Sequence, residues 1–312
     1  MNIQISVIVP IYNMQNFIVR TVDCLISQDA NDIEFILIDD GSQDNTLALI
    51  HQKITGDSRF RVISISNHGY GYACNLGIRE ARGRYVGIYE PDDMITPDFY
   101  SELQSIANKY PHADVIRYNG IIKNYGDHTE QMYHWKDKYT GRMIDKYEMP
   151  RFWRSHPSIY NGLYKKNFIK KNDICFCETP SASFQDAMFL ISLYYSDPNI
   201  FIINKAKYYY TIHANQSMQN IGSKIEQIVQ NWKIEYDWLK KMGIEDKSFF
   251  QYRITMQTYI IDKKLHDRDI YKRLCKSLSS YYKLKFVFCQ IATWKEKIGC
   301  FLMYLKIKAI MD

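Results

Sequence analysis

Acidic, aromatic and amide side chains follow three predicted strands of this chain, at the points where those strands end. The three sets are Pro10-Ile11-Tyr12-Asn13, Asp39-Asp40 and Glu90-Pro91-Asp92-Asp93. Ligands of open α/β sheets bind outside the carboxyl ends of the strands, so three such sets at one edge predict a single site. Carboxylates there can hold a hard cation or accept a proton. Structural explanations stay open, since Asp40 can belong to a turn and Asp93 can cap a helix.

Strand and helix signals alternate through the first 120 residues, which is the pattern that would bring these strand ends together. Predicted strands cover residues 3–9, 33–38, 61–65, 85–89 and 114–118. Predicted helices cover residues 15–28, 44–53, 71–82 and 97–109. The alternation predicts an α/β fold with a mainly parallel sheet flanked by helices.

Length and composition predict a folded protein in two parts. With 312 residues, 46% hydrophobic and 24% charged, the chain is too apolar for a disordered protein. We expect a catalytic domain at 1–220 and a helical, basic C-terminal region at 221–312. No run of about 20 apolar residues is evident and no basic leader precedes the first strand, so we expect a cytoplasmic protein. Seven scattered cysteines read as reduced thiols.

The positive charge is concentrated near the end of the chain. The net charge is +6, and the segment from residue 271 onward holds nine basic and two acidic residues. Residues 281–288 and 301–306 mix aromatic side chains with lysines. Such a segment can lie peripherally on an anionic membrane, at its inner face, or simply pack an apolar side on the catalytic domain. Nucleic acid is not expected as a partner, because no recognised binding module accompanies the charge.

The motifs and their order resemble the inverting family-2 glycosyltransferases, which have the GT-A fold. The motifs are Ser6-Val7-Ile8-Val9-Pro10-Ile11-Tyr12-Asn13, Phe35 through Asp44, Asn75-Leu76-Gly77-Ile78, Ala81 through Val86, Glu90-Pro91-Asp92-Asp93, and Ser183-Phe184-Gln185-Asp186. The resemblance covers about residues 3–217. Residues 156–160 and 178–180 resemble a branch that builds bacterial surface polysaccharides. The resemblance implies a GT-A (Rossmann-like) sheet with a C-terminal helical extension.

The resemblance also implies a divalent metal. Transfer from a nucleotide sugar expels a nucleoside diphosphate, whose charge Mn²⁺ or Mg²⁺ would neutralise. The implied ligands are Asp93, then Asp92, then Glu90, and Glu90 stands where an aspartate is more usual. His213 is a further candidate ligand for the metal or the phosphates.

A nucleotide-sugar pocket is implied as well. Tyr12 would stack on the base, Asp40 would accept a hydrogen bond from its imino N–H, and Pro10 would shape the same turn. Uracil carries that donor, so UDP is favoured over GDP or dTDP, although dTDP shares the donor. Asp92 would meet the phosphates, and Gly71 and Asn75 would line the pocket, although a plain helix start explains the last two equally well.

The acceptor hydroxyl needs a base, and by resemblance this base is Asp186. A carboxylate in hydrogen-bond reach contributes about 10²–10⁴-fold in rate. Alternatively, Asp186 caps the helix predicted at 187–195. A single in-line displacement would invert the anomeric centre.

We therefore predict a metal-dependent inverting glycosyltransferase (a hexosyltransferase) that extends a glycan or lipid-linked glycan of surface polysaccharide, such as lipooligosaccharide or capsule. One alternative is a nucleotidyltransferase that makes sugar nucleotides, although such enzymes usually carry a Gly- and Arg-rich loop where residues 10–13 stand. The other is a non-catalytic glycan-binding homologue, which the Glu90 substitution keeps open.

Overall fold

The computed structural model describes residues 3–133, 140–144, 158–180, 184–213, 221–264, 268–279, 281, 294–295, 297–299, 301–302 and 305. The strands are β1 (Ile5–Ile11), β2 (Ile33–Asp39), β3 (Phe60–Ser64), β4 (Tyr85–Ile88), β5 (Met94–Ile95), β6 (Val115–Asn124), β7 (Thr129–Tyr133), β8 (Met143–Ile144), β9 (Gly162–Lys165) and β10 (Ile200–Thr211). The helices are α1 (Ile18–Ile26), α2 (Thr46–Lys53), α3 (Tyr70–Glu80), α4 (Phe99–Lys109), α6 (Lys166–Lys171), α7 (Gln185–Tyr195), α8 (Ile225–Lys241), α9 (Ser248–Lys264) and α10 (Arg268–Ser279), with a 3₁₀ turn, η2 (Ile221–Lys224).

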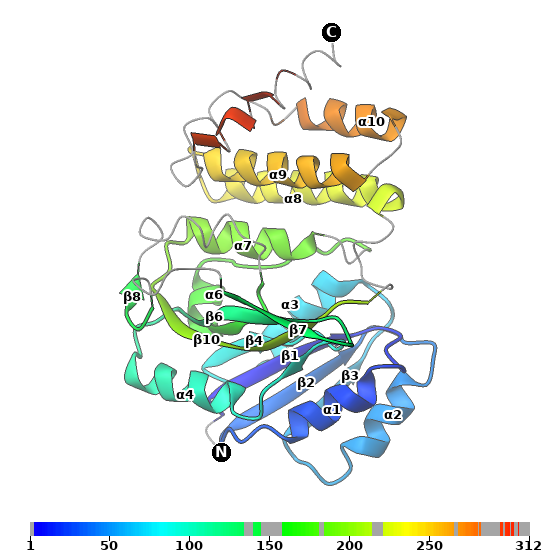
Figure 1. Cartoon of the computed structure of the whole chain (residues 1–312), viewed down its shortest axis with the longest axis vertical. Helices are drawn as coiled ribbons and strands as arrows, with labels where there is room; N and C mark the ends of the chain where they lie inside the picture. The colour runs from blue at the N-terminus through cyan, green and yellow to red at the C-terminus, as the bar shows by residue number, and fades with distance from the viewer. Residues whose placement is uncertain are drawn as a thin grey trace.

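One mixed sheet organises the described residues, with strand order β3-β2-β1-β4-β9-β6-β10-β5. The pairs among β3, β2, β1 and β4 are parallel, as is β6 with β10. Every residue of β1, β2 and β4 is buried, because both faces of the sheet are covered. Figure 1 shows the layers: α1, α2 and α4 lie below the sheet, and α7 lies above it.

The strand order reverses direction at β1, which places a crevice there. The chain runs from β1 outward to β2 and β3, then returns to β4 on the other side of β1. Pairing of β1 with β2 continues to Ile11, whereas pairing with β4 ends at Ile8. Pro10, predicted to shape the following turn, lies inside β1, and having no N–H it cannot extend the pairing with β4. The carboxyl ends of β1 and β4 therefore form the switch point where open α/β sheets bind ligands.

The predicted α/β sheet is confirmed, and the antiparallel strands are what the sequence did not reveal. The predicted strand at 114–118 is the first half of the ten-residue β6. Strand β9 pairs antiparallel with both β4 and β6, and β5 and β8 pair antiparallel with β10. These strands have two to four residues, too short to show a hydrophobic period of their own.

The C-terminal helices continue the core of the sheet. Helices α8 and α9 lie above α7, and α10 lies above them (Figure 1). A single hydrophobic cluster runs from Ile5 on β1 to Trp232 on α8 and Leu274 on α10. The predicted boundary at residue 220 falls among residues 214–220, outside the described part, and remains a prediction. None of the helices in the described part of the chain has the length and apolar character that crossing a bilayer requires.

A buried carboxyl on α8 makes the stability of this helical part depend on pH. Glu235 is fully buried, and neither of its oxygens has a hydrogen-bond partner among the described residues. Burial raises the pKa of Glu235 well above its usual range, against the nearby Arg253 guanidinium, which lowers it. Because the pKa of Glu235 is higher in the folded state than in the unfolded state, the folded state binds this proton more tightly. The free energy of unfolding therefore falls as pH rises above the unfolded-state pKa near 4.5.

We therefore expect Glu235→Gln to be more stable than the wild type at pH 8, by about 1–3 kcal/mol, with the difference shrinking toward pH 4. Urea unfolding at both pH values measures this. Glu245→Gln, at an exposed position, is the control and should change little at either pH. A wild-type advantage at pH 8 would contradict the expectation.

Candidate functional site

The loops after β1 and β2 hold each other in place at the crevice. Asn13, whose φ is 51°, donates its N–H to Ser42 Oγ at 3.0 Å, and its Oδ1 accepts the Gln43 N–H at 2.8 Å. The Asp44 carboxylate accepts the Thr46 N–H at the start of α2, where the sequence predicted a helix from residue 44. This mutual bonding leaves Tyr12 at the end of β1 with 43% of its side chain exposed. Tyr12 is thus a fixed, accessible aromatic ring at the switch point.

Asp40 fixes a third loop at the same edge. Its two carboxylate oxygens accept the backbone N–H groups of His68 and Gly69, each at 2.7 Å. Asp40 is 3% exposed. Since a carboxylate offers about four acceptor positions, two remain after these bonds. The arrangement brings the start of α3 against the end of β2.

Glu90 follows β4 and is partly buried. Its Oε1 accepts the Tyr70 hydroxyl at 2.6 Å. Burial, and then repulsion from Asp92 and Asp186, raises the pKa of Glu90 to about 8, against the Tyr70 hydrogen bond, which lowers it. The charges of Asp92, in the same turn, and of Asp186, on α7, thus both act on Glu90.

Asp92 faces His213 across the crevice. Its Oδ2 lies 2.8 Å from His213 Nε2, and both side chains are about one-fifth exposed. Arg20 of α1 donates to the backbone oxygen of Asp92 at 2.7 Å. The Phe17 ring lies 5.0 Å from the His213 ring, between centroids. The turn that carries Asp92 and the residue that follows β10 are thereby held together.

Asp93, the preferred metal ligand of the sequence prediction, points the other way, into the protein. Its Oδ2 accepts the Tyr208 hydroxyl and its Oδ1 accepts the Thr211 N–H, both at 2.7 Å. It is 1% exposed, and burial together with repulsion from Asp92 holds the pKa of its carboxyl well above the usual range. Adjacent residues of a tight turn direct their side chains apart, so only Asp92 faces the crevice. In this structure Asp93 joins the turn to β10.

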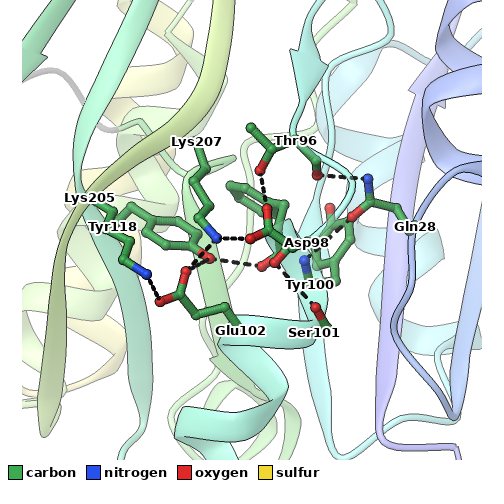
Figure 2. A network of polar contacts seen from close by, with 10 residues as sticks. Gln28, Thr96, Asp98, Tyr100, Ser101, Glu102, Tyr118, Lys205 and Lys207 are labelled. Carbon is green, nitrogen blue, oxygen red and sulfur yellow. Dashed lines mark hydrogen bonds and ion pairs between the residues drawn. The ribbon is translucent and has the colours of Figure 1, made fainter.

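A polar network joins β10 to α4 and to the turn before it (Figure 2). Lys207 pairs with Asp98 and, at 2.6 Å, with Glu102 of α4, which also pairs with Lys205 at 2.6 Å. The Tyr118 hydroxyl donates to Glu102 Oε2 at 3.2 Å and to a backbone oxygen of α4. Strand β10, which leads to His213, is thus fixed by α4 next to Lys207 and by Asp93 at Tyr208.

Helix α7 brings Asp186 to the site through its neighbour, Gln185. Gln185 is 1% exposed, accepts the Gly71 N–H at 2.8 Å, and donates to the Thr179 hydroxyl at 2.7 Å. Asp186 stands in the first turn of α7, after Phe184, whose φ of 59° is left-handed. Within the described residues no hydrogen bond or ion pair engages the Asp186 carboxylate. It is half-buried beside the crevice and available to a ligand.

Gly71 and Asn75, predicted to line the pocket, are used in packing. A Cβ on Gly71 would lie 1.8 Å from the backbone oxygen of Cys177. The Asn75 amide donates to the Phe176 oxygen and to Glu178, and accepts the Phe176 N–H. Both residues attach the loop before α7 to α3, and their place in the donor pocket stays a prediction.

Gly71→Ala is expected to destabilise the fold by about 1–3 kcal/mol or more, since the new methyl group overlaps a backbone oxygen. Urea unfolding measures the loss, and Gly299→Ala, where a Cβ meets no atom within 4 Å, should change stability by less than about 0.5 kcal/mol. Equal effects of the two substitutions would contradict the packing role.

The assembled site brings four carboxyl groups together. Glu90, Asp92, Asp93 and Asp186 belong to it, and among the described residues none of them pairs with a lysine or arginine side chain. No three His, Cys, Asp or Glu side chains of the described residues come close enough together to hold a metal by themselves. Asp92 and His213 form a two-residue donor set with its carboxylate and imidazole partly open to solvent. Such a set would need further ligands from a bound molecule.

Comparison with known protein families decides the class. A family model described as glycosyl transferase family 2 matches residues 6–190, which contain β1 through most of α7. The chain belongs to glycosyl transferase family 2. Membership of this family disfavours the nucleotidyltransferase alternative.

Curated relatives of this glycosyltransferase come from bacteria. It is 27% identical over 217 residues to the uncharacterized glycosyltransferase EpsJ of Bacillus subtilis (strain 168), covering 68% of this chain and 62% of EpsJ. It is 33% identical over 145 residues to chondroitin synthase of Escherichia coli, covering 45% of this chain and 21% of the synthase. The chain thus spans less than two thirds of either relative.

Solved structures share the fold over nearly the whole chain. Staphylococcus aureus TarS 1–349, solved in complex with UDP-GlcNAc, has a TM-score of 0.76 at 18% identity, covering 99% of this chain and 89% of that one. The mannosyltransferase PcManGT from Pyrobaculum calidifontis, solved with GDP-Man and Mn²⁺, has a TM-score of 0.57 at 13% identity, covering 100% and 86%. The GT-A-like fold with a C-terminal helical region is confirmed by this likeness.

Several residues that build the site of this family-2 chain were not among the site residues predicted from the sequence. Tyr70, Gln185 and Tyr208 each bond to a residue far away in the chain, and Tyr208 is one of 26 tyrosines. Only Gln185 could have been found, as the neighbour of Asp186. Ser183 and residues 156–157 and 214–217, which the predicted motifs include, lie outside the described residues.

Proposed function

We propose that this glycosyltransferase moves a sugar from a UDP-linked donor to a hydroxyl of a glycan, with inversion at the anomeric carbon and with a divalent metal. The observation that carries the proposal is the meeting of Asp92, His213, Glu90 and Asp186 at the β1–β4 switch point without a pairing lysine or arginine among the described residues. Carboxylate and imidazole donors gathered in this way favour a cationic metal together with a ligand whose phosphates complete the metal's coordination.

Asp92 and His213 are the residues proposed to hold Mn²⁺ or Mg²⁺. A carboxylate and an imidazole suit Mn²⁺, and ions of this kind commonly take only one or two protein ligands when substrate phosphates supply the rest. The bound ion would neutralise charge on the departing diphosphate. Asp93 is proposed to hold the turn against Tyr208 rather than to touch the metal, and Glu90 lies behind Asp92 with its hydrogen bond to Tyr70.

The nucleotide is proposed to lie between the ends of β1 and β2. Tyr12 offers an exposed ring for stacking, and Asp40 retains acceptor capacity for an imino N–H. Uracil supplies that donor at N3 and guanine supplies one at N1, so the hydrogen bond to Asp40 does not by itself separate the two bases. TarS, with a similar fold, was solved with UDP and with UDP-GlcNAc, which supports a UDP-linked donor here.

Asp186 is proposed as the general base. Its carboxylate would take the proton of the acceptor hydroxyl while that oxygen bonds to the anomeric carbon, and the carbon–oxygen bond to the diphosphate breaks with its electron pair. One displacement with no covalent enzyme intermediate inverts the centre. Gln185 holds Asp186 in place by joining α7 to α3.

The acceptor class is proposed from the relatives. EpsJ and EpsH of Bacillus subtilis are named as glycosyltransferases, and the chondroitin synthases of Escherichia coli and Pasteurella multocida make a polysaccharide by name. These relatives support a glycan acceptor in surface polysaccharide synthesis.

A thermal-shift panel of nucleotide sugars with and without Mn²⁺ tests the proposal. A ligand at 100 times its Kd stabilises the folded state by about 2.7 kcal/mol. We expect UDP-sugars with Mn²⁺ to give the largest rise in Tm, and GDP-sugars or Mn²⁺ alone to give less. An equal response to all nucleotides, or none to any, would contradict the proposed donor.

A further inference from the structure

Five large apolar side chains near the end of the chain are exposed on one face. Exposed fractions are 67% for Trp294, 50% for Ile298, 39% for Phe301, 58% for Leu302 and 45% for Leu305. The described residues between 294 and 305 are helical. In helical backbone, spacings of four, three, one and three residues bring these five described side chains to one side, which is called here the 294–305 face.

Exposed apolar side chains are more closely spaced on the 294–305 face than on the rest of the described surface. Only six other large apolar side chains of the described residues are exposed, and they are scattered between Tyr12 and Tyr259. Single exposed apolar side chains are ordinary, but contiguous apolar surface marks an interaction site in a soluble protein. A helix face of this kind gains free energy when something apolar covers it.

The positive charge near the 294–305 face indicates which kind of partner covers it. Lys295 and Lys297 flank Glu296 in the sequence of this segment, which leaves it one net positive charge, and the Lys295 ammonium is 5.7 Å from the centroid of the Trp294 ring. Nine basic and only two acidic residues follow position 270 in the sequence. A second copy of the chain would bring the same positive charge against itself, whereas anionic phospholipid headgroups attract it.

We propose that the 294–305 face lies on an anionic phospholipid bilayer, with Trp294 and Leu302 entering the boundary between headgroups and acyl chains. A tryptophan and aliphatic side chains on one face, with lysines beside them, are the features of helices that lie in a membrane interface. The segment lies at the end of the molecule, with α8, α9 and α7 between it and the sheet (Figure 1). Membrane contact therefore leaves the donor crevice uncovered.

Vesicle flotation of the full chain tests this proposal. The probes are vesicles of phosphatidylcholine alone and of phosphatidylcholine mixed with phosphatidylglycerol. Binding is expected only to the mixed vesicles and should weaken as salt is raised. The double variant Trp294→Gln, Leu302→Gln should bind at least about tenfold more weakly, since two apolar side chains no longer enter the bilayer.

The matched control is Ile26→Gln, Met242→Gln, which removes two exposed apolar side chains elsewhere and should bind like the wild type. Both double variants should keep the wild-type Tm, because all four positions are exposed. Absence of wild-type binding to the mixed vesicles, or equal binding by the 294/302 variant, would overturn the proposal. So would a variant that loses self-association in gel filtration but keeps vesicle binding, which would assign the face to a second copy. Donor binding is measured separately by thermal shift, so failure of either proposal leaves the other testable.

Discussion

Asp186→Asn is expected to lower turnover by about 10²–10⁴-fold, because an amide cannot take the proton of the acceptor hydroxyl. The variant should bind the donor nearly as well as the wild type, since Asp186 is proposed to meet the acceptor rather than the nucleotide. The fold should also be unaffected: the carboxylate has no hydrogen bond or ion pair within the described residues, and Gln185 makes the contacts that hold α7. Steady-state transfer and a UDP-dependent thermal shift measure the two parts.

Glu226→Gln is the matched control for Asp186→Asn. Glu226 is exposed in the first turn of α8, so the substitution removes the same charge from a comparable helix position. It should leave turnover unchanged. Unchanged turnover in Asp186→Asn itself would remove the residue from the role of base, and equal losses in both variants would assign the effect to the helix termini.

His213→Ala and Asp92→Ala are each expected to lower kcat/KM by about 10²–10³-fold in Mn²⁺. The expectation follows from the several kcal/mol that a bound cation contributes at a departing phosphate, at about 1.4 kcal/mol for each tenfold. Both variants should also lose the extra rise in Tm that Mn²⁺ gives in the presence of UDP. Activity assays across Mn²⁺ concentrations and thermal shift measure these effects.

The chain offers a matched control for this pair. His128 lies 2.7 Å from Asp127 in a similar ion pair that is far more exposed, in the turn between β6 and β7. His128→Ala should leave both the Mn²⁺ dependence and the activity unchanged. Retention of the Mn²⁺-dependent Tm rise in His213→Ala would contradict the proposed pair.

The parallel part of the sheet could be predicted because its strands are buried on both faces. Runs such as residues 33–38 are then continuously apolar, and the polar residues that end them stand out. The position of the site followed from the same pattern, since parallel strands end at one edge. Tyr12, Asp40, Glu90 and Asp92 all lie at the edge that the sequence predicted.

The direction of adjacent side chains could not be predicted. Asp92 and Asp93 are chemically identical, and which of them faces the crevice depends on Tyr208 and Thr211, more than a hundred residues later. The orientation of the Asn75 amide is likewise set by its hydrogen bonds to the Phe176 backbone, and not by its position on α3. These choices rest on tertiary contacts, which leave no local pattern in the chain.

Anomalous scattering from crystals grown with UDP and Mn²⁺ would locate both the metal and the nucleotide. We predict one manganese peak between the Asp92 carboxylate and the His213 imidazole, bridged to the diphosphate, with the base against Tyr12. A manganese peak elsewhere on the chain, or UDP bound away from the ends of β1 and β4, would contradict the account.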